Sequence, residues 1–144
     1  MIVQSEALRR HVHTAVMDVR WGDMDAMGHV NNTVYFRYLE QARIEWFGQI
    51  DAMANPLGIG PVIINAHCTF MKQLKYPDRI EVKTYAGAPG RSSFETMQDI
   101  RLLDANGAPG TLVSSGGAKI VWVDSRIEKS VPLPDAIRAR LAGA

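Results

Sequence analysis

The chain has one long segment with helical periodicity, over residues 33–47, and this segment limits the folds that are open to it. Its large apolar side chains recur every three or four residues and share one face of a helix. The residues of this face are Tyr35, Tyr38, Leu39, Ala42 and Trp46, whereas Arg37, Glu40, Gln41 and Arg43 lie to the side or opposite. A helix with one apolar face buries that face against another layer, so this helix needs a sheet to cover.

Strand-like segments fill most of the remaining chain. Alternating or continuous apolar residues predict strands over 13–21, 62–71, 80–86, 94–103 and 112–123. The segment 62–71 is largely apolar, which predicts a central strand. The short connections 87–90 and 104–110 are rich in turn residues and predict antiparallel hairpins. With a loop over 48–61 and a short helix over 134–141, the pattern predicts an α+β fold in which an antiparallel sheet wraps over one helix.

Composition excludes several classes of function. Sixteen basic residues against fifteen acidic ones give a net charge of +1, so no overall field favours nucleic acid or an anionic membrane. No run approaches the length that spans a bilayer, and residues 1–10 lack the apolar core of a signal peptide. We therefore expect a cytoplasmic protein without stable membrane association. The length of 144 residues, with no repeat or linker, predicts a single domain over 1–144.

Cysteine and histidine show no metal-binding pattern. Cys68 is the single cysteine, which excludes an internal disulfide and fits a reducing compartment. The four histidines, His11, His13, His29 and His67, do not recur at a recognised ligand spacing. We therefore expect neither a metal ion nor another cofactor.

The segment before the helix combines carboxylates, glycines and amides. Residues 21–32 read Trp-Gly-Asp-Met-Asp-Ala-Met-Gly-His-Val-Asn-Asn, with Asp23 and Asp25 as the carboxylates. Unpaired backbone N–H groups at a helix start carry partial positive charge and can polarise a carbonyl oxygen. A nearby carboxylate can then attack that carbonyl or deliver water, so the arrangement is typical of a small hydrolytic site.

The same residues carry a family resemblance. The segment 23–35, with Glu40, Ala42 and Arg43 downstream, resembles the acyl-CoA thioesterases of the hotdog fold. It is similar to the 4-hydroxybenzoyl-CoA thioesterase family and, within it, to the fatty-acyl-CoA branch, which has the His-Val-Asn-Asn form seen here. Together with later features of the chain, the resemblance covers about residues 12–135.

The resemblance implies a hotdog fold with a five- or six-stranded antiparallel sheet around the central helix. It implies an activity as well, the hydrolysis of an acyl-CoA to a free acid and CoA. This reaction needs no cofactor. Thioesterases that act on acyl groups held by acyl-carrier protein are the alternative within enzymes. A non-catalytic acyl-CoA binding protein of the same fold is the alternative outside them.

The resemblance also assigns roles to residues of the motif. It makes Asp25 the catalytic carboxylate, either a nucleophile that forms a mixed anhydride or a base that activates water, and leaves Asp23 to stabilise the turn. The backbone N–H of Asn32 would hold the thioester oxygen at the positive helix end. Gly28 supplies a special backbone conformation or a close approach. His29 orients Asp25 or contacts the thioester, with a purely structural role as the alternative.

Further residues are assigned to substrate binding. Tyr35 matches the position that faces the acyl channel, with a core role as the alternative. The CoA phosphates and pantetheine arm are assigned to a turn formed by Gly90, Arg91, Ser92 and Ser93. Glu40 is the reserve carboxylate, because some other hotdog branches place theirs on this helix.

The acyl group and the assembly are further expectations. The loop 48–61 is expected to line an apolar acyl pocket, with a preference for medium or long aliphatic chains and a place in fatty acid metabolism. One helix covers only one face of a sheet, and open edge strands are normally paired, so we expect a homodimer or homotetramer. The resemblance adds that active sites form between chains, with Asp25 from one and the Arg91 region from the other.

Overall fold

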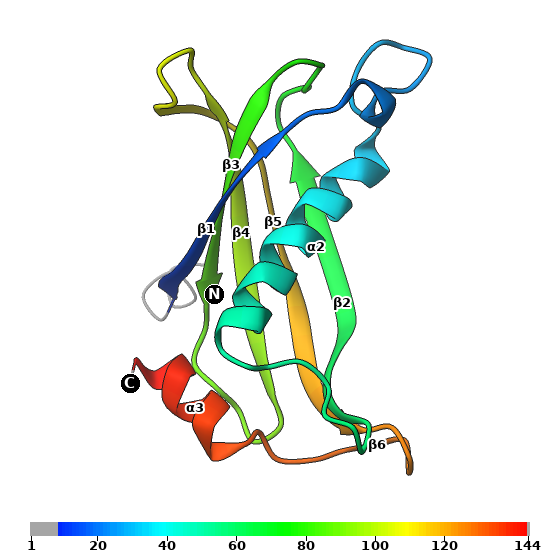
Figure 1. Cartoon of the computed structure of the whole chain (residues 1–144), viewed down its shortest axis with the longest axis vertical. Helices are drawn as coiled ribbons and strands as arrows, with labels where there is room; N and C mark the ends of the chain where they lie inside the picture. The colour runs from blue at the N-terminus through cyan, green and yellow to red at the C-terminus, as the bar shows by residue number, and fades with distance from the viewer. Residues whose placement is uncertain (1–8, 144) are drawn as a thin grey trace.

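Helix α2 lies across one face of an antiparallel sheet (Figure 1). The structure is a computed structural model, and it describes residues 9–143. The strands are β1 (Arg10–Asp18), β2 (Ile59–Phe70), β3 (Arg79–Ala86), β4 (Ser93–Leu103), β5 (Pro109–Asp124) and β6 (Lys129–Ser130). The helices are the 3₁₀ turn η1 (Trp21–Asp23), α2 (Asn32–Gln49) and α3 (Asp135–Ala142). The predicted α+β architecture, with one long helix, is confirmed.

The strands follow the order β1-β3-β4-β5-β2, with β6 beside β5, and all pairs are antiparallel. The two predicted hairpins join β3 to β4 and β4 to β5 and are confirmed. In the second hairpin Gly107 has a φ of +82°, which glycine adopts without strain. The Asp104 carboxylate accepts hydrogen bonds from the N–H groups of Asn106 and Ala108, which closes the turn.

The predicted apolar face of α2 is the face that packs on the sheet. Its five residues, Tyr35, Tyr38, Leu39, Ala42 and Trp46, are all buried. They join two hydrophobic clusters, one with Ile80 and Ile100 and one with Phe94 and Trp122. Full burial of a large apolar side chain contributes about 1.5–3 kcal/mol, so packing on the sheet stabilises this helix more than intrinsic propensity does.

The charge of Arg43 predicts an exposed position on α2, but the structure buries this residue. The residue is only 8% exposed, and this burial lowers the pKa of its guanidinium. Its Nε has no hydrogen-bond partner among residues 9–143. On the exposed side of the helix, Glu40 Oε1 lies 3.5 Å from Arg37 Nη1. The long apolar stem of an arginine can pack in a core position, which a pattern of charges does not reveal.

Strand β2 is an edge strand, which corrects the prediction that 62–71 is central. It pairs with β5, and most of its twelve residues are exposed, including Val62, Ile63 and Ile64. A continuous apolar strand is usually buried on both faces, but within the described chain β2 has one strand neighbour. An exposed apolar edge of this length is a surface that proteins normally cover.

Strand β1 ends earlier than the sequence pattern predicts, whereas the C-terminal helix forms as predicted. Strand β1 ends at Asp18, before the predicted end at Trp21, because the Asp23 carboxylate accepts the Arg20 N–H at 2.9 Å and closes the turn η1. Trp21 is therefore 72% exposed rather than half-buried in a strand. The short C-terminal helix is confirmed as α3, which packs Ile137 into the cluster around Trp46.

The single-domain prediction for 1–144 includes residues 1–8 and 144, which lie outside the described residues. The expectation that residues 1–10 form no signal peptide lies largely outside them too. None of the helices within 9–143 has both the length and the apolar character that a membrane crossing requires.

Candidate active site

Asp25 lies in a tight loop between η1 and α2. Its Oδ1 accepts the Met27 N–H at 2.9 Å, and its Oδ2 lies 3.4 Å from the Nδ2 donor of Asn31. The backbone of Asp25 donates to the His29 carbonyl at 2.9 Å and accepts from the Gly28 N–H at 3.0 Å. The residue itself is exposed. The loop thus fixes the carboxylate from behind and leaves it open to a substrate.

Gly28 provides the backbone conformation that this loop needs. Its φ is +79°, in the left-handed region that other residues rarely adopt. A Cβ at this position would meet no atom within 4 Å. The left-handed conformation accounts for the glycine within the chain, where no atom of residues 9–143 lies close to that Cβ.

The start of α2 leaves one backbone donor without an internal partner. Asn31 is the N-cap, and its Oδ1 accepts from the N–H of Thr33 at 2.9 Å and from the Thr33 hydroxyl at 2.7 Å. The Asn31 carbonyl accepts the Val34 N–H at 2.9 Å. The N–H of Asn32, the first residue of the helix, finds no acceptor among the described residues. It is the donor at the helix start that remains available to a ligand.

Asp23 has a different environment from Asp25. Its Oδ2 accepts the Tyr38 hydroxyl at 2.7 Å, and its carbonyl accepts the Asn31 N–H at 3.1 Å. Burial, together with the bond to Asp23, raises the pKa of the Tyr38 hydroxyl, which favours the protonated form that donates to Asp23. The Asp23 side chain is only 13% exposed. Its contacts hold η1 against α2, which is structural support for the loop that carries Asp25.

A pocket of about 500 Å³ brings predicted residues together. Asp25, His29, Asn32 and Tyr35 all line it, together with Phe70, Met71 and Lys72 from the end of β2 and the bend after it. This volume suits a small-molecule ligand or part of a larger one. The pocket combines an exposed carboxylate, an available N–H donor and apolar side chains, which is what the hydrolysis of an acyl compound needs.

Tyr35 belongs to the core and to the pocket wall at once. It is 3% exposed, and burial raises the pKa of its hydroxyl. That hydroxyl donates to the Lys72 carbonyl at 3.0 Å and accepts the Leu74 N–H at 3.1 Å. Leu74 in turn accepts the Val30 N–H at 2.8 Å. These bonds tie α2, the Asp25 loop and the segment after β2 into one rigid wall.

The segment of Gly90, Arg91, Ser92 and Ser93 does not lie beside Asp25 within one chain. Strand β3 separates the two sites, and its eight residues span about 26 Å. Figure 1 shows the Asp25 loop at one end of the sheet and the connection from β3 to β4 at the other end, near α3. The loop 48–61, expected to line the acyl pocket, follows the C-terminal end of α2 and is likewise far from Asp25 in the same chain.

Two basic residues near this segment, Arg138 and Lys119, were not predicted from the sequence. Arg138 of α3 donates through Nη2 to the carbonyls of Gly90 at 2.8 Å and Arg91 at 3.0 Å. Lys119 lines a pocket of about 310 Å³ with Gly90 and Ser93. Lys119 reaches this place because it pairs with Glu95 across β4 and β5. Only the strand register and the docking of α3 reveal these neighbours, and the sequence gives no local signal for either.

The described residues contain no group of three or more His, Cys, Asp or Glu side chains that could hold a metal ion. Cys68 is half-buried, with Sγ 3.4 Å from the Ser114 hydroxyl, and burial raises the pKa of its thiol. A thiol of this kind reacts slowly at neutral pH, so Cys68 is a poor nucleophile.

Comparison with known proteins gives one family and several relatives. Residues 19–141 match the Thioesterase-like superfamily. The solved structure of PA2801 from Pseudomonas aeruginosa, described as a putative thioesterase, is 39% identical with a TM-score of 0.83, over 92% of this chain and 99% of that one. A putative esterase of Aquifex aeolicus is 37% identical over 96 residues, 61% of this chain and 75% of its own length. The chain spans 53% of the length of a further relative, the uncharacterized protein YsmA of Bacillus subtilis, at 27% identity.

Proposed function

Because the chain belongs to the Thioesterase-like superfamily and is a thioester hydrolase, we propose that it hydrolyses acyl-CoA thioesters to a free acid and CoA. Asp25 is the nucleophile or general base in this proposal, and the Asn32 N–H is the donor to the thioester oxygen. One observation carries the proposal. An exposed carboxylate and an available N–H at a helix start line the same pocket.

The chemistry follows from where charge develops. When the thioester carbon is attacked, its carbonyl oxygen gains negative charge, which the Asn32 N–H and the positive end of α2 stabilise. As a nucleophile, Asp25 forms a mixed anhydride and expels the CoA thiolate, and water then cleaves the anhydride. As a base, Asp25 takes a proton from water while the water oxygen attacks the carbon; the tetrahedral intermediate then breaks its C–S bond and expels the CoA thiolate, which takes up the proton. His29, in the same pocket, orients Asp25 or contacts the thioester.

The proposed active form is a homodimer that joins two β2 edges, with a homotetramer as its further assembly. In a single chain Asp25 is exposed to solvent, which weakens electrostatic stabilisation of a transition state. Antiparallel pairing of β2 with a second β2 would cover the apolar edge. The two-fold axis of such a dimer would place the end of one sheet that carries the Asp25 loop beside the end of the other sheet that carries the connection from β3 to β4. The partner's Arg91 would then approach Asp25, which the length of β3 prevents within one chain.

The proposed contact to the CoA phosphates is the Arg91 side chain, with Gly90, Ser92 and Ser93 beside it. Arg91 is exposed, and its backbone is held by Arg138 and by the Leu133 N–H, which donates to the Arg91 carbonyl at 2.9 Å. A guanidinium can pair with a phosphate through two hydrogen bonds. A fixed backbone lowers the entropy that such a contact costs.

The acyl group we propose is a medium or long aliphatic chain, and the process is cytoplasmic fatty acid metabolism. The apolar part of the pocket, with Phe70 and Met71, supports this choice. Each buried methylene contributes about 0.8 kcal/mol to binding. Longer chains should therefore bind better until the pocket is filled.

Release of free CoA thiol from acetyl-, octanoyl- and palmitoyl-CoA tests the function. Octanoyl- or palmitoyl-CoA should give a higher kcat/KM than acetyl-CoA by tenfold or more. The half-buried Cys68 contributes a slow background to a thiol reagent, and protein without substrate measures it. Equal efficiency on all three would overturn the chain-length choice. Turnover only of octanoyl-acyl-carrier protein would overturn the choice of CoA.

A further inference from the structure

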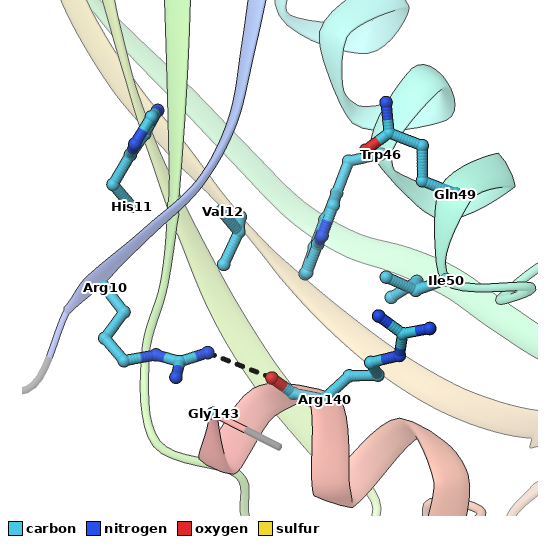
Figure 2. A pocket seen from close by; sticks show the side chains of 8 residues that line it. All are labelled: Arg10, His11, Val12, Trp46, Gln49, Ile50, Arg140 and Gly143. Carbon is cyan, nitrogen blue, oxygen red and sulfur yellow. Dashed lines mark hydrogen bonds between the residues drawn. The ribbon is translucent and has the colours of Figure 1, made fainter.

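A second pocket lies at the opposite end of α2 from Asp25. The 18 residues of the helix span about 27 Å, so the two pockets are well separated. The second pocket has a volume of about 390 Å³ and lies between β1, the end of α2 and α3 (Figure 2). No residue assigned to thioester hydrolysis lines it.

The lining of this pocket divides into an apolar part and a cationic part. Val12, Trp46 and Ile50 supply the apolar surface. Figure 2 shows the guanidinium groups of Arg10 and Arg140 reaching the pocket from β1 and from α3. His11 is also at the rim, but its ring packs against Tyr85, with the ring centroids 5.6 Å apart.

Both guanidinium groups keep donors for a ligand. Arg10 uses Nη2 to donate to the Arg140 carbonyl at 2.9 Å, which anchors the end of α3 and occupies one of its five N–H donors. The Arg140 guanidinium makes no hydrogen bond or ion pair with another described residue. Arg138, two positions away, is in contrast committed to the carbonyls of Gly90 and Arg91.

The described residues that line the pocket include two arginines and no carboxylate. A groove along α2 shows the opposite case. There Arg37 pairs with Glu40 at 3.5 Å, and Arg20 lies 3.9 Å from Asp23. Two cations without a carboxylate form a local anion-attracting field, although the whole chain has a net charge of only +1.

We propose that this pocket binds a small carboxylic acid. Its carboxylate pairs with the Arg10 and Arg140 guanidinium groups, and its hydrocarbon body lies on Val12, Trp46 and Ile50. Guanidinium groups bind carboxylates and phosphates through paired hydrogen bonds. The apolar surface favours the acid, because an inorganic phosphate has nothing to place on it. The site does not depend on the proposed function, although the free acids released by that reaction belong to this class.

Titration with octanoate tests the proposal. The NMR signal of the Trp46 indole N–H, identified by its loss in Trp46→Phe, reports on this pocket and lies far from Asp25. Octanoate should shift the signal saturably, and 1-octanol, with the same chain and no charge, should bind at least tenfold more weakly. Equal binding of octanol would overturn the role of the two arginines. Binding of phosphate or ADP as tight as that of octanoate would overturn the choice of a carboxylic acid.

A pair of matched variants completes the test. Arg140→Gln should weaken octanoate binding at least tenfold. Arg37→Gln removes the same charge from an exposed helical position outside this pocket and should leave the affinity within twofold of the original. Thermal unfolding of both variants establishes that the protein remains folded. An Arg140→Gln protein that is folded and binds octanoate with unchanged affinity would refute the site.

Discussion

The two ends of α2 present opposite chemistry. At its N-terminus the polar side chains around the loop are committed to structure, and the group left available is a backbone N–H beside the exposed Asp25. Near its C-terminal end the Trp46 and Phe47 carbonyls accept the N–H groups of Ile50 and Ala52, and the side chains that line the pocket there include two arginines. Backbone donors do not move, whereas long cationic side chains adapt to a ligand. The first end is therefore suited to stabilising a transition state, and the second to holding an anion in its ground state.

If this division is correct, variants near the N-terminal end change kcat, and variants at the opposite end of the sheet change KM or binding. The largest effect is expected for Asp25→Asn. The change keeps the size of the side chain and removes the charge that attacks the thioester or accepts a proton. We expect kcat to fall about 100-fold or more, with KM little changed, in steady-state assays of CoA release.

The controls for Asp25→Asn are Asp23→Asn and Glu40→Gln. Both should lower kcat less than Asp25→Asn, because Asp23 is committed to Tyr38 and Glu40 lies beside Arg37 on the helix surface. Matching unfolding temperatures and retained binding of a non-hydrolysable acyl-CoA analogue exclude a folding defect. A folded Asp25→Asn protein with near-normal kcat would move the chemistry to Glu40.

Arg91→Ala is expected to have the next largest effect. Losing a charged hydrogen bond to a phosphate costs about 1.5–3 kcal/mol, so KM for acyl-CoA should rise about tenfold or more while kcat stays nearly constant. The difference from the original protein should shrink at high salt. Acylated pantetheine, which lacks the nucleotide phosphates, is the control substrate. If its KM rises equally, Arg91 does not contact phosphate.

Arg138→Gln should produce a smaller change of the same kind. It releases two hydrogen bonds to the backbone of Gly90 and Arg91 and leaves the Arg91 side chain in place. We expect KM to rise about threefold, on the scale of one net hydrogen bond. The variant Arg91→Ala/Arg138→Gln provides the check. If Arg138 acts through Arg91, the double variant should be no worse than Arg91→Ala alone.

Tyr38→Phe is the smallest expected change, and it lies at the N-terminal end. Asp23 loses one donor but keeps the Arg20 N–H at 2.9 Å. The unfolding free energy should fall by about 1 kcal/mol, and kcat should fall only a fewfold, since Asp25 is touched only through the loop. Chemical denaturation and the same CoA-release assay measure both. A rise in KM without a change in kcat would contradict the division between the two ends.

The fold was largely predictable because local patterns agree with one another. The helical period and the Asn106–Gly107 turn both correspond to structure, and the Thioesterase-like match together with the antiparallel sheet confirms the hotdog fold. The position of β2 was not predictable, because an apolar strand has the same sequence whether its own chain or another chain covers it. The burial of Arg43 was not predicted, because its charge indicates an exposed position whereas its apolar stem allows a buried one.

The lining of the candidate pocket was predictable where it is continuous in sequence. Asp25, His29 and Asn32 are close together in the chain, and the structure places all three in one pocket. Phe70 and Lys72 line that pocket from the end of β2 and the bend after it, where Tyr35 hydrogen-bonds to the backbone. Arg138 depends on where α3 docks. Long-range contacts of this kind leave no periodic signal in the chain.

In the proposed mechanism, Asn31 links the stability of α2 to turnover. Its Oδ1 caps α2 while its Nδ2 lies 3.4 Å from Asp25. Aspartate caps helices as well as asparagine does, so a search for stabilising substitutions would accept Asn31→Asp. The exchange would set a second carboxylate against Asp25, and the two would repel. Laboratory evolution that selects for both heat tolerance and turnover would therefore reject Asn31→Asp, and the stabilising substitutions would have to lie at other positions.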